Sequence, residues 1–168
     1  YDNNNMISTV TLSIIVGQHE IIVNDELESD TNWLIGASDD DATNGIWERA
    51  VPNPTYDDNG QIIQPDEDHT IDGSFCYITQ NPSDVGSNPG SNDVDGGKTT
   101  LISPLFELSE YDGAIITYWK WYTNNQGNNP GSDFWQVDVT VDNGDTWVSL
   151  ENTNISNNSW EKHQFFLN

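Results

Sequence analysis

Short apolar segments separated by polar loops run along the whole chain and define its expected elements. β-Branched and aromatic residues dominate the segments, whereas Asp, Asn, Gly, Pro and Ser fill the intervals between them. Segments of this kind are typical of antiparallel β-strands. Because no stretch repeats with the period of a helix, we predict an all-β antiparallel β-sandwich. The expected strands and short apolar runs are 6–16, 21–23, 33–35, 45–51, 74–79, 98–103, 113–123, 134–141, 146–150 and 160–167.

The segment 113–123 alternates most clearly and provides the best candidate for a binding surface. Successive side chains of a strand point to opposite faces of its sheet. One face of this segment would carry Ile115, Thr117, Trp119 and Trp121. The other face carries two tyrosines that flank a lysine, and we expect it to contact a ligand through Tyr118, Lys120 and Tyr122.

The aromatic residues allow two interpretations, because rings fill the cores of sandwiches and exposed rings can stack on sugars. The tryptophans in strand-like segments are expected in the core: Trp33, Trp47, Trp119, Trp135 and Trp147. The tyrosines expected at the surface are Tyr56, Tyr111, Tyr118 and Tyr122. The long loop region 52–70, which contains a short Gln-Ile-Ile run, is of a length that is usually functional or mobile.

A large excess of negative charge restricts the partners of the chain. It has 28 Asp and Glu against 4 Lys and Arg, and a formal net charge of -24. Such a surface repels phosphate, which argues against nucleic acid and anionic membranes as partners. Bound calcium could neutralise part of the charge, or the surface could be adapted to salty water, and both can hold together. No apolar segment is long enough for membrane insertion.

The single cysteine, Cys76, lies in an apolar run and cannot form an internal disulfide. We expect a small buried side chain there rather than a nucleophile, because the nearby charge is mostly negative and would raise the thiol pKa.

Two acidic loops have the composition of a calcium (Ca2+) site, since this hard cation takes six to eight oxygen ligands. The first contains three consecutive aspartates, 39–41, followed by Asn44 and Gly45. The second has the pattern Asp-x-Asp-Gly at Asp93 and Asp95. It is not an EF-hand, because no Glu stands at the twelfth position of the loop. The alternative is that both loops are simply solvated.

No set of residues indicates catalysis, and we expect a chain that is not an enzyme. His69 follows three acidic residues, but His19 and His163 are distant from it and show no zinc spacing, so we expect a hydrogen-bonded loop anchor. With 28 acids, a pair suited to a glycosidase would arise by chance. Neither a serine nucleophile elbow nor a phosphate-binding glycine loop is present.

The segment 140–147 matches the Asp-box pattern of sialidases and other β-proteins. In that pattern the Asp side chain caps a tight hairpin and the Trp packs beneath it. Asp142-Asn-Gly is also a favourable hairpin turn on physical grounds. The match does not imply sialidase activity, because Arg49 is the single arginine of the chain.

Several short motifs, in a fixed order, together resemble a known family. They lie at 25–33, 41–49, 64–70, 74–79, 93–104, 118–122 and 141–147. In this order they resemble the MAM-like jelly-roll accessory domains of secreted bacterial proteins, including cleaved-adhesin ("choice-of-anchor J") modules. The resemblance implies a jelly-roll β-sandwich over 18–168 with structural calcium, and it makes 1–17 a strand or linker from a preceding module. By resemblance, Asp39 and Asp41 would be calcium ligands together with Glu28.

The chain departs from that family at its end, because such domains usually continue beyond the strand equivalent to 160–167. We expect a fragment, which also fits a start at Tyr1, or a sandwich whose missing strand is supplied by another chain. The apolar segment 6–16 could act as such a donor. The sequence therefore predicts a non-catalytic, secreted or cell-surface module that binds polysaccharide or a protein surface. The alternative is a subunit that self-assembles by strand exchange.

Overall fold

The computed structural model describes residues 20–167, and this part of the chain is all-β. A single 3₁₀ turn, η1 (Pro89–Ser91), interrupts the strands, and no helix among the described residues could cross a membrane. The expected strand 6–16, the boundary at residue 17 and His19 lie outside the described residues. The strands are β1 (Leu34–Ile35), β2 (Trp47–Ala50), β3 (Thr55–Tyr56), β4 (Ile62–Gln64), β5 (Cys76–Thr79), β6 (Leu101–Ile102), β7 (Ala114–Tyr122), β8 (Trp135–Val139), β9 (Val148–Thr153) and β10 (Asn157–Leu167).

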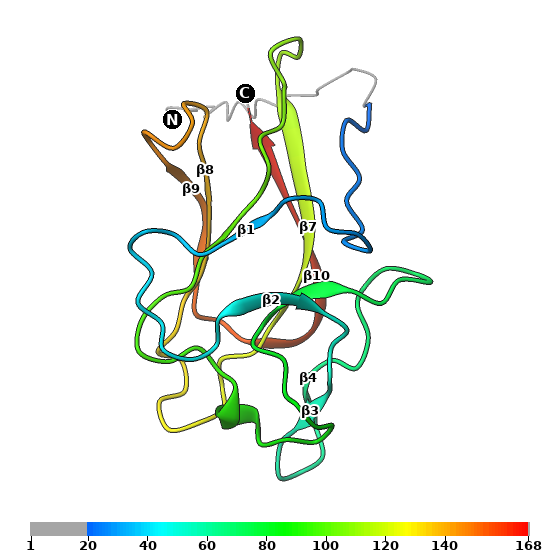
Figure 1. Ribbon diagram of the computed structural model, residues 1–168, viewed down its shortest axis with the longest axis vertical. Helices are drawn as coiled ribbons and strands as arrows, with labels where there is room; N and C mark the ends of the chain where they lie inside the picture. The colour runs from blue at the N-terminus through cyan, green and yellow to red at the C-terminus, as the bar shows by residue number, and fades with distance from the viewer. Residues whose placement is uncertain (1–19, 168) are drawn as a thin grey trace, which may run out of the picture.

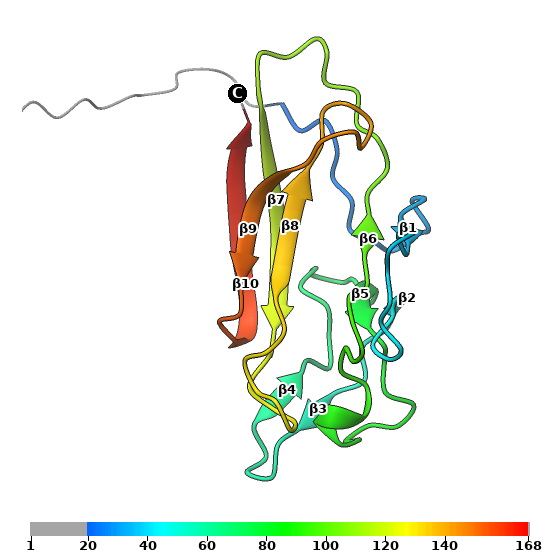
Figure 2. The same cartoon turned by 90° about the vertical axis from the view of Figure 1, so that its left-hand side faces the viewer.

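Every strand pairs with one neighbour in an antiparallel ladder. The pairs are β1–β6, β2–β5, β3–β4, β7–β10 and β8–β9. Figure 2 shows β7–β10 and β8–β9 in one layer, with β1–β6 and β2–β5 in the layer facing it. The β3–β4 hairpin lies at one end of the molecule (Figure 1). The predicted all-β antiparallel fold is therefore confirmed.

The two layers are joined by aromatic contacts and by a small buried core. The ring of Trp47 on β2 meets that of Trp135 on β8 edge to face, with centroids 6.0 Å apart. Trp121 on β7 donates from Nε1 to the carbonyl of Ile63 at 2.7 Å, which attaches the β3–β4 hairpin to the long sheet. Few apolar side chains are buried among the described residues: Pro52, Pro54, Ile63, Pro65, Cys76, Ile78 and Pro82.

Strand β7 alternates as predicted, but the face expected in the core is the more exposed one, and the face expected to bind a ligand is the more buried one. Ile115 and Trp119, expected to face the core, are 39% and 42% exposed. Lys120, expected to face a ligand, is 5% exposed. The physical reason is that Lys120 finds a carboxylate partner on β9, so its charge is neutralised without water.

Two further differences concern short segments. The run 21–23 is not a strand, and its apolar side chains are exposed. The loop region 52–70 contains a hairpin, β3–β4, in which Asp57 caps the turn by accepting hydrogen bonds from Asn59 and Gln61. The tip of this hairpin lies beside two other loops.

Candidate functional site

Three loops that are distant in sequence meet at the end of the molecule that carries the β3–β4 hairpin. They are residues 56–59, 88–95 and 126–133, and Figure 1 shows all three at the same end of the ribbon. Two adjoining cavities lie between them, of about 360 and 380 Å³. The cavities share five lining residues, so we treat them as one feature, the loop groove: Asn88, Gly90, Gln126, Gly127 and Asn128.

Hydrogen bonds of the Asn44 side chain and backbone hold the second of these loops in place. The Asn44 side chain donates to the carbonyls of Ser91 and Asp93, at 3.2 and 3.0 Å. Its backbone carbonyl accepts from the amide of Asp95. The next residue, Gly45, has a φ of +71°, and a Cβ there would overlap the backbone of Val94. The close approach of loop 88–95 therefore requires a glycine at position 45.

Asn124 and Tyr122 fix the C-terminal end of the loop 126–133. Asn124 accepts from the amide of Gly131 through its backbone carbonyl, and its side chain donates to the carbonyl of Asp133 at 2.7 Å. The Tyr122 hydroxyl donates to the same carbonyl at 3.0 Å. These bonds keep Asp133 next to the groove.

Three carboxylates line one end of the groove: Asp93, Asp95 and Asp133. None of the ion pairs in the described part of the chain includes any of them. Burial raises the pKa of Asp93, and the negative charges of Asp95 and Asp133 raise it further. Burial and the charge of Asp95 likewise raise the pKa of Asp133. The cluster is thus a region of uncompensated negative charge.

One atom of the cluster indicates a missing partner. Asp93 Oδ1 is buried and has no hydrogen-bond partner in the described part of the chain. A buried carboxylate oxygen without a donor is costly, and a cation is one group that would satisfy it. Among residues 20–167, however, no three His, Cys, Asp or Glu side chains converge closely enough to hold a metal by themselves. A calcium ion here would need carbonyl, amide and water oxygens in addition, which this cation accepts.

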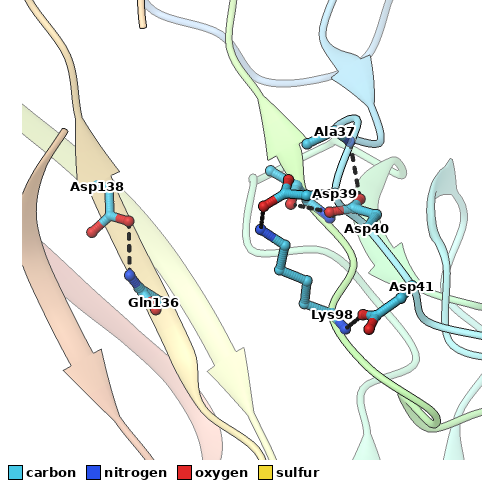
Figure 3. A network of polar contacts seen from close by, with 8 residues as sticks. Ala37, Asp39, Asp40, Asp41, Lys98, Gln136 and Asp138 are labelled. Atoms are coloured by element: carbon cyan, nitrogen blue, oxygen red, sulfur yellow. Dashed lines mark hydrogen bonds and ion pairs between the residues drawn. The ribbon is translucent and has the colours of Figure 1, made fainter. Parts of the chain in front are cut away.

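The three carboxylates of the first predicted acidic loop, residues 39–41, all accept hydrogen bonds from protein groups (Figure 3). Lys98 donates from Nζ to Asp39 at 2.6 Å and from its backbone amide to Asp41 at 2.9 Å. Asp40 accepts from Ala37 and from both the amide and the hydroxyl of Thr100. Glu28 lies apart from this network and accepts from the amides of Ser74 and Phe75, at 2.8 and 2.9 Å. The loop is thus held by hydrogen bonds that tie it to the chain before β6.

The predicted ligand face of β7 forms an interior polar network. The hydroxyl of Tyr118 and the ammonium of Lys120 both donate to the carboxylate of Glu151 on β9. His163 on β10 stacks on the Tyr118 ring, with centroids 5.3 Å apart. Lys120 Nζ also lies 5.3 Å from the centroid of the Trp135 ring. These side chains therefore join β7, β8, β9 and β10, and the structure does not present Lys120 to a surface ligand.

The Asp-box segment forms the capped turn that was predicted. The Asp142 carboxylate accepts from the Thr140 hydroxyl and from both the amide and the hydroxyl of Thr146. Trp147 donates from Nε1 to the carbonyl of Gly144 at 3.2 Å. This residue was expected in the core, but it is 49% exposed because it covers the turn at the surface. The arrangement stabilises the β8–β9 connection and leaves no polar group of Asp142 free for chemistry.

His69 was expected as a hydrogen-bonded loop anchor, and it anchors its loop by stacking instead. Its ring lies parallel to Trp119, with centroids 3.5 Å apart, and meets Trp160 edge to face. No hydrogen bond of its side chain is found among the described residues. The contact covers part of the exposed Trp119 ring.

Asp133 is the member of the carboxylate cluster that sequence reasoning missed. It stands alone in a Gly-Ser-Asp loop before β8, far along the chain from Asp93 and Asp95. No local spacing connects these residues, so only the packing of the two loops reveals them as neighbours.

Comparison of the chain with protein-family models, with curated proteins and with solved structures gives no match. Its function must therefore be argued from the geometry of this chain alone.

Proposed function

We propose that this chain is a non-catalytic binding module, stabilised by calcium at the loop end and exposed at the surface of a cell or secreted. Its work would be recognition of a polysaccharide or a protein surface. The observation that supports a cation is the cluster of Asp93, Asp95 and Asp133. Within residues 20–167 it has no basic partner, and one of its buried carboxylate oxygens is unpaired.

The chemistry of the donor set favours calcium over a transition metal. The cluster offers carboxylate oxygens, and carboxamide oxygens of Asn88 and Asn128 line the same cavity. Hard oxygen ligands suit calcium, whereas zinc and copper sites use histidine or cysteine, which are absent from this lining. Charge neutralisation would relieve the repulsion that raises the pKa of Asp93 and Asp133.

Thermal unfolding in EDTA and in millimolar calcium tests the proposal. Calcium at 100 times its Kd stabilises a folded state by about 2.7 kcal/mol, which raises Tm by roughly 5–10 °C for a chain of this size. The variant Asp93→Asn should lose most of that rise. Asp112→Asn, which removes the same charge from an exposed residue, should keep it. An equal response of the two variants, or no rise in the parent chain, would overturn the calcium site.

A second function, assembly by strand exchange, is favoured by one feature of β10. This strand has 11 residues, and within residues 20–167 it pairs with β7 alone. A long strand with one unpaired edge accepts a strand from another chain. The proposed donor is the apolar segment 6–16, which lies outside the described residues. Light scattering of the full chain and of a chain lacking 1–16 tests this: discrete oligomers should form in the first sample and be lost in the second. A monomer in both would exclude assembly.

A further inference from the structure

The loop groove is lined almost entirely by groups that can form hydrogen bonds. Its side chains are mainly carboxamides and carboxylates with one serine hydroxyl, and its apolar surfaces come from Tyr56, Pro89 and Val94. Pockets for apolar cofactors are instead lined mainly by hydrophobic side chains. A ligand of this groove must therefore replace the hydrogen bonds of the water that it displaces, or binding would leave polar groups unpaired. Polyhydroxylated molecules meet that requirement.

Several polar groups of the groove are not engaged by the protein. The side chain of Asn128 makes no hydrogen bond among the described residues, although both its oxygen and its nitrogen are available. Asn88 uses its Oδ1 to accept from the amide of Gly90 at 2.9 Å, which leaves its Nδ2 as a free donor. Because the Asn88 side chain is fixed by that bond, its donor is already oriented before a ligand arrives.

Tyr56 differs from the tyrosines of β7. It is 40% exposed and lines the groove, and its hydroxyl makes no hydrogen bond within the described part of the chain. The hydroxyls of Tyr118 and Tyr122, in contrast, are both engaged by protein acceptors. Its place on β3, in the capped β3–β4 hairpin, gives the ring a firm support. An exposed aromatic ring beside free amides can cover the apolar face of a sugar while the amides bind its hydroxyls.

The charge of the groove selects among such ligands. No lysine or arginine lines either cavity, and the carboxylates at its two ends are Asp57, Asp58, Asp93, Asp95 and Asp133. Uronic acids, sulfated sugars and phosphates would be repelled. The cavities together are large enough for a short stretch of sugar chain, since ligand sites commonly occupy about 300–1,000 Å³.

We propose that the loop groove binds a neutral polysaccharide, with Tyr56 stacked on a sugar ring and Asn88 and Asn128 bonded to its hydroxyls. This inference rests on the proposed binding function and names its ligand class and its site. The site is separate from the β7 face that the sequence had suggested, and the calcium cluster forms one of its ends.

Affinity electrophoresis in gels that contain one soluble polysaccharide each tests the proposal. The probes are dextran, xylan, galactomannan, laminarin and hydroxyethyl cellulose, with carboxymethyl cellulose and chitosan as charged counterparts. We expect retardation by at least one neutral probe and none by carboxymethyl cellulose. Retardation by chitosan alone would indicate a site for cations, and no retardation by any neutral probe would overturn the inference.

Matched variants locate the binding. Tyr56→Ala and Asn128→Ala should each weaken retention by about tenfold or more, as expected for central contacts. Tyr111→Ala, which removes a tyrosine that is 42% exposed outside the groove, should leave retention unchanged. Equal retention of the Tyr56 and Tyr111 variants would refute the site, provided that both keep the parent melting temperature.

The two proposals fail in different ways. A calcium-dependent rise in Tm without retention on neutral polysaccharide overturns the groove and leaves the cation site standing. Retention that persists in EDTA, together with no calcium-dependent rise, overturns the cation site and leaves the groove standing.

Discussion

Lys120 and Glu151, which are 31 positions apart in the chain, form a buried ion pair with an Nζ–Oε1 distance of 2.5 Å. Burial opposes ionisation of Glu151, but hydrogen bonds from Lys120 and Tyr118 outweigh it and hold the pKa of this carboxyl below its usual value. His163 Nδ1 lies 3.5 Å from the same carboxylate. The pair therefore holds β7, β9 and β10 in one arrangement, because any slip of these strands would leave a charge buried alone.

Removing one partner of this pair should be far more damaging than removing both. Lys120→Met should lower the free energy of unfolding by about 3–5 kcal/mol, since Glu151 is left buried without its cation. The double variant Lys120→Met/Glu151→Leu should recover much of that loss. Urea denaturation measures both. The control Lys162→Met, at an exposed lysine, should change stability by less than about 0.5 kcal/mol. A Lys120 variant as stable as this control would contradict the interior role.

Asp133 should destabilise the metal-free protein at neutral pH. Its pKa is raised in the folded state, so the folded chain keeps a proton that the unfolded chain has lost. The contribution of Asp133 to the free energy of unfolding therefore falls as pH rises from its ordinary pKa of 3.8 to the raised value. Asp133→Asn should raise Tm in EDTA at pH 7 and should reduce the calcium-dependent rise. If this variant melts below the parent chain in EDTA, the repulsion inferred for the cluster is wrong.

Asp142 should contribute stability with the opposite pH dependence. Hydrogen bonds from Thr146 and Thr140 lower its pKa from 3.8 to about 2. The stabilisation is complete above the ordinary pKa and disappears as pH falls through about 2. Asp142→Ala should lower Tm at pH 7 and should flatten the acid limb of the stability profile between those two values. Asp145→Asn, in the same turn, serves as the control and should retain the parent profile.

The Cys76 thiol should be inert in the folded protein. Burial raises its pKa to about 12, and the negative charges of Asp68 and Glu28 add to this effect. A thiol that stays protonated and covered does not attack a disulfide reagent. We expect no reaction with Ellman's reagent under native conditions and one equivalent in urea. Rapid reaction of the native chain would show that the core around β5 opens readily.

The alternation of apolar and polar residues predicted the long strands well, because that signal is local. Ala114–Tyr122 and Trp135–Val139 needed nothing beyond their own sequence to be recognised as strands, β7 and β8. The β3–β4 hairpin was missed, since strands of two and three residues in a Pro- and Asp-rich region carry little periodicity. The turn at Asp142 was predicted correctly, because all of its hydrogen-bonding partners lie within a few residues.

The orientation of β7 and the composition of the groove could not be predicted in the same way. A lysine between two tyrosines suggests a surface, and only the arrival of Glu151 from a distant strand makes burial of Lys120 possible. The carboxylate cluster likewise joins Asp133 to Asp93 and Asp95 through tertiary packing. The sequence predicted two cation loops. The one at Asp93 and Asp95 stays a prediction, whereas the carboxylates of the one at Asp39 and Asp41 accept hydrogen bonds from Lys98.

The scarcity of cationic residues has a consequence for digestion of the folded chain. A trypsin-like protease can cut after Arg49, Lys98, Lys120 and Lys162 and nowhere else. Arg49, Lys120 and Lys162 lie within β2, β7 and β10, so their peptide bonds are held in ladders. The bond after Lys98 is in a loop, yet its side chain is bound to Asp39 and its amide to Asp41. Three of the four tryptic bonds are thus held in strands, and the bond after Lys98, whose side chain is 54% exposed, is the one at which digestion of the folded chain should begin.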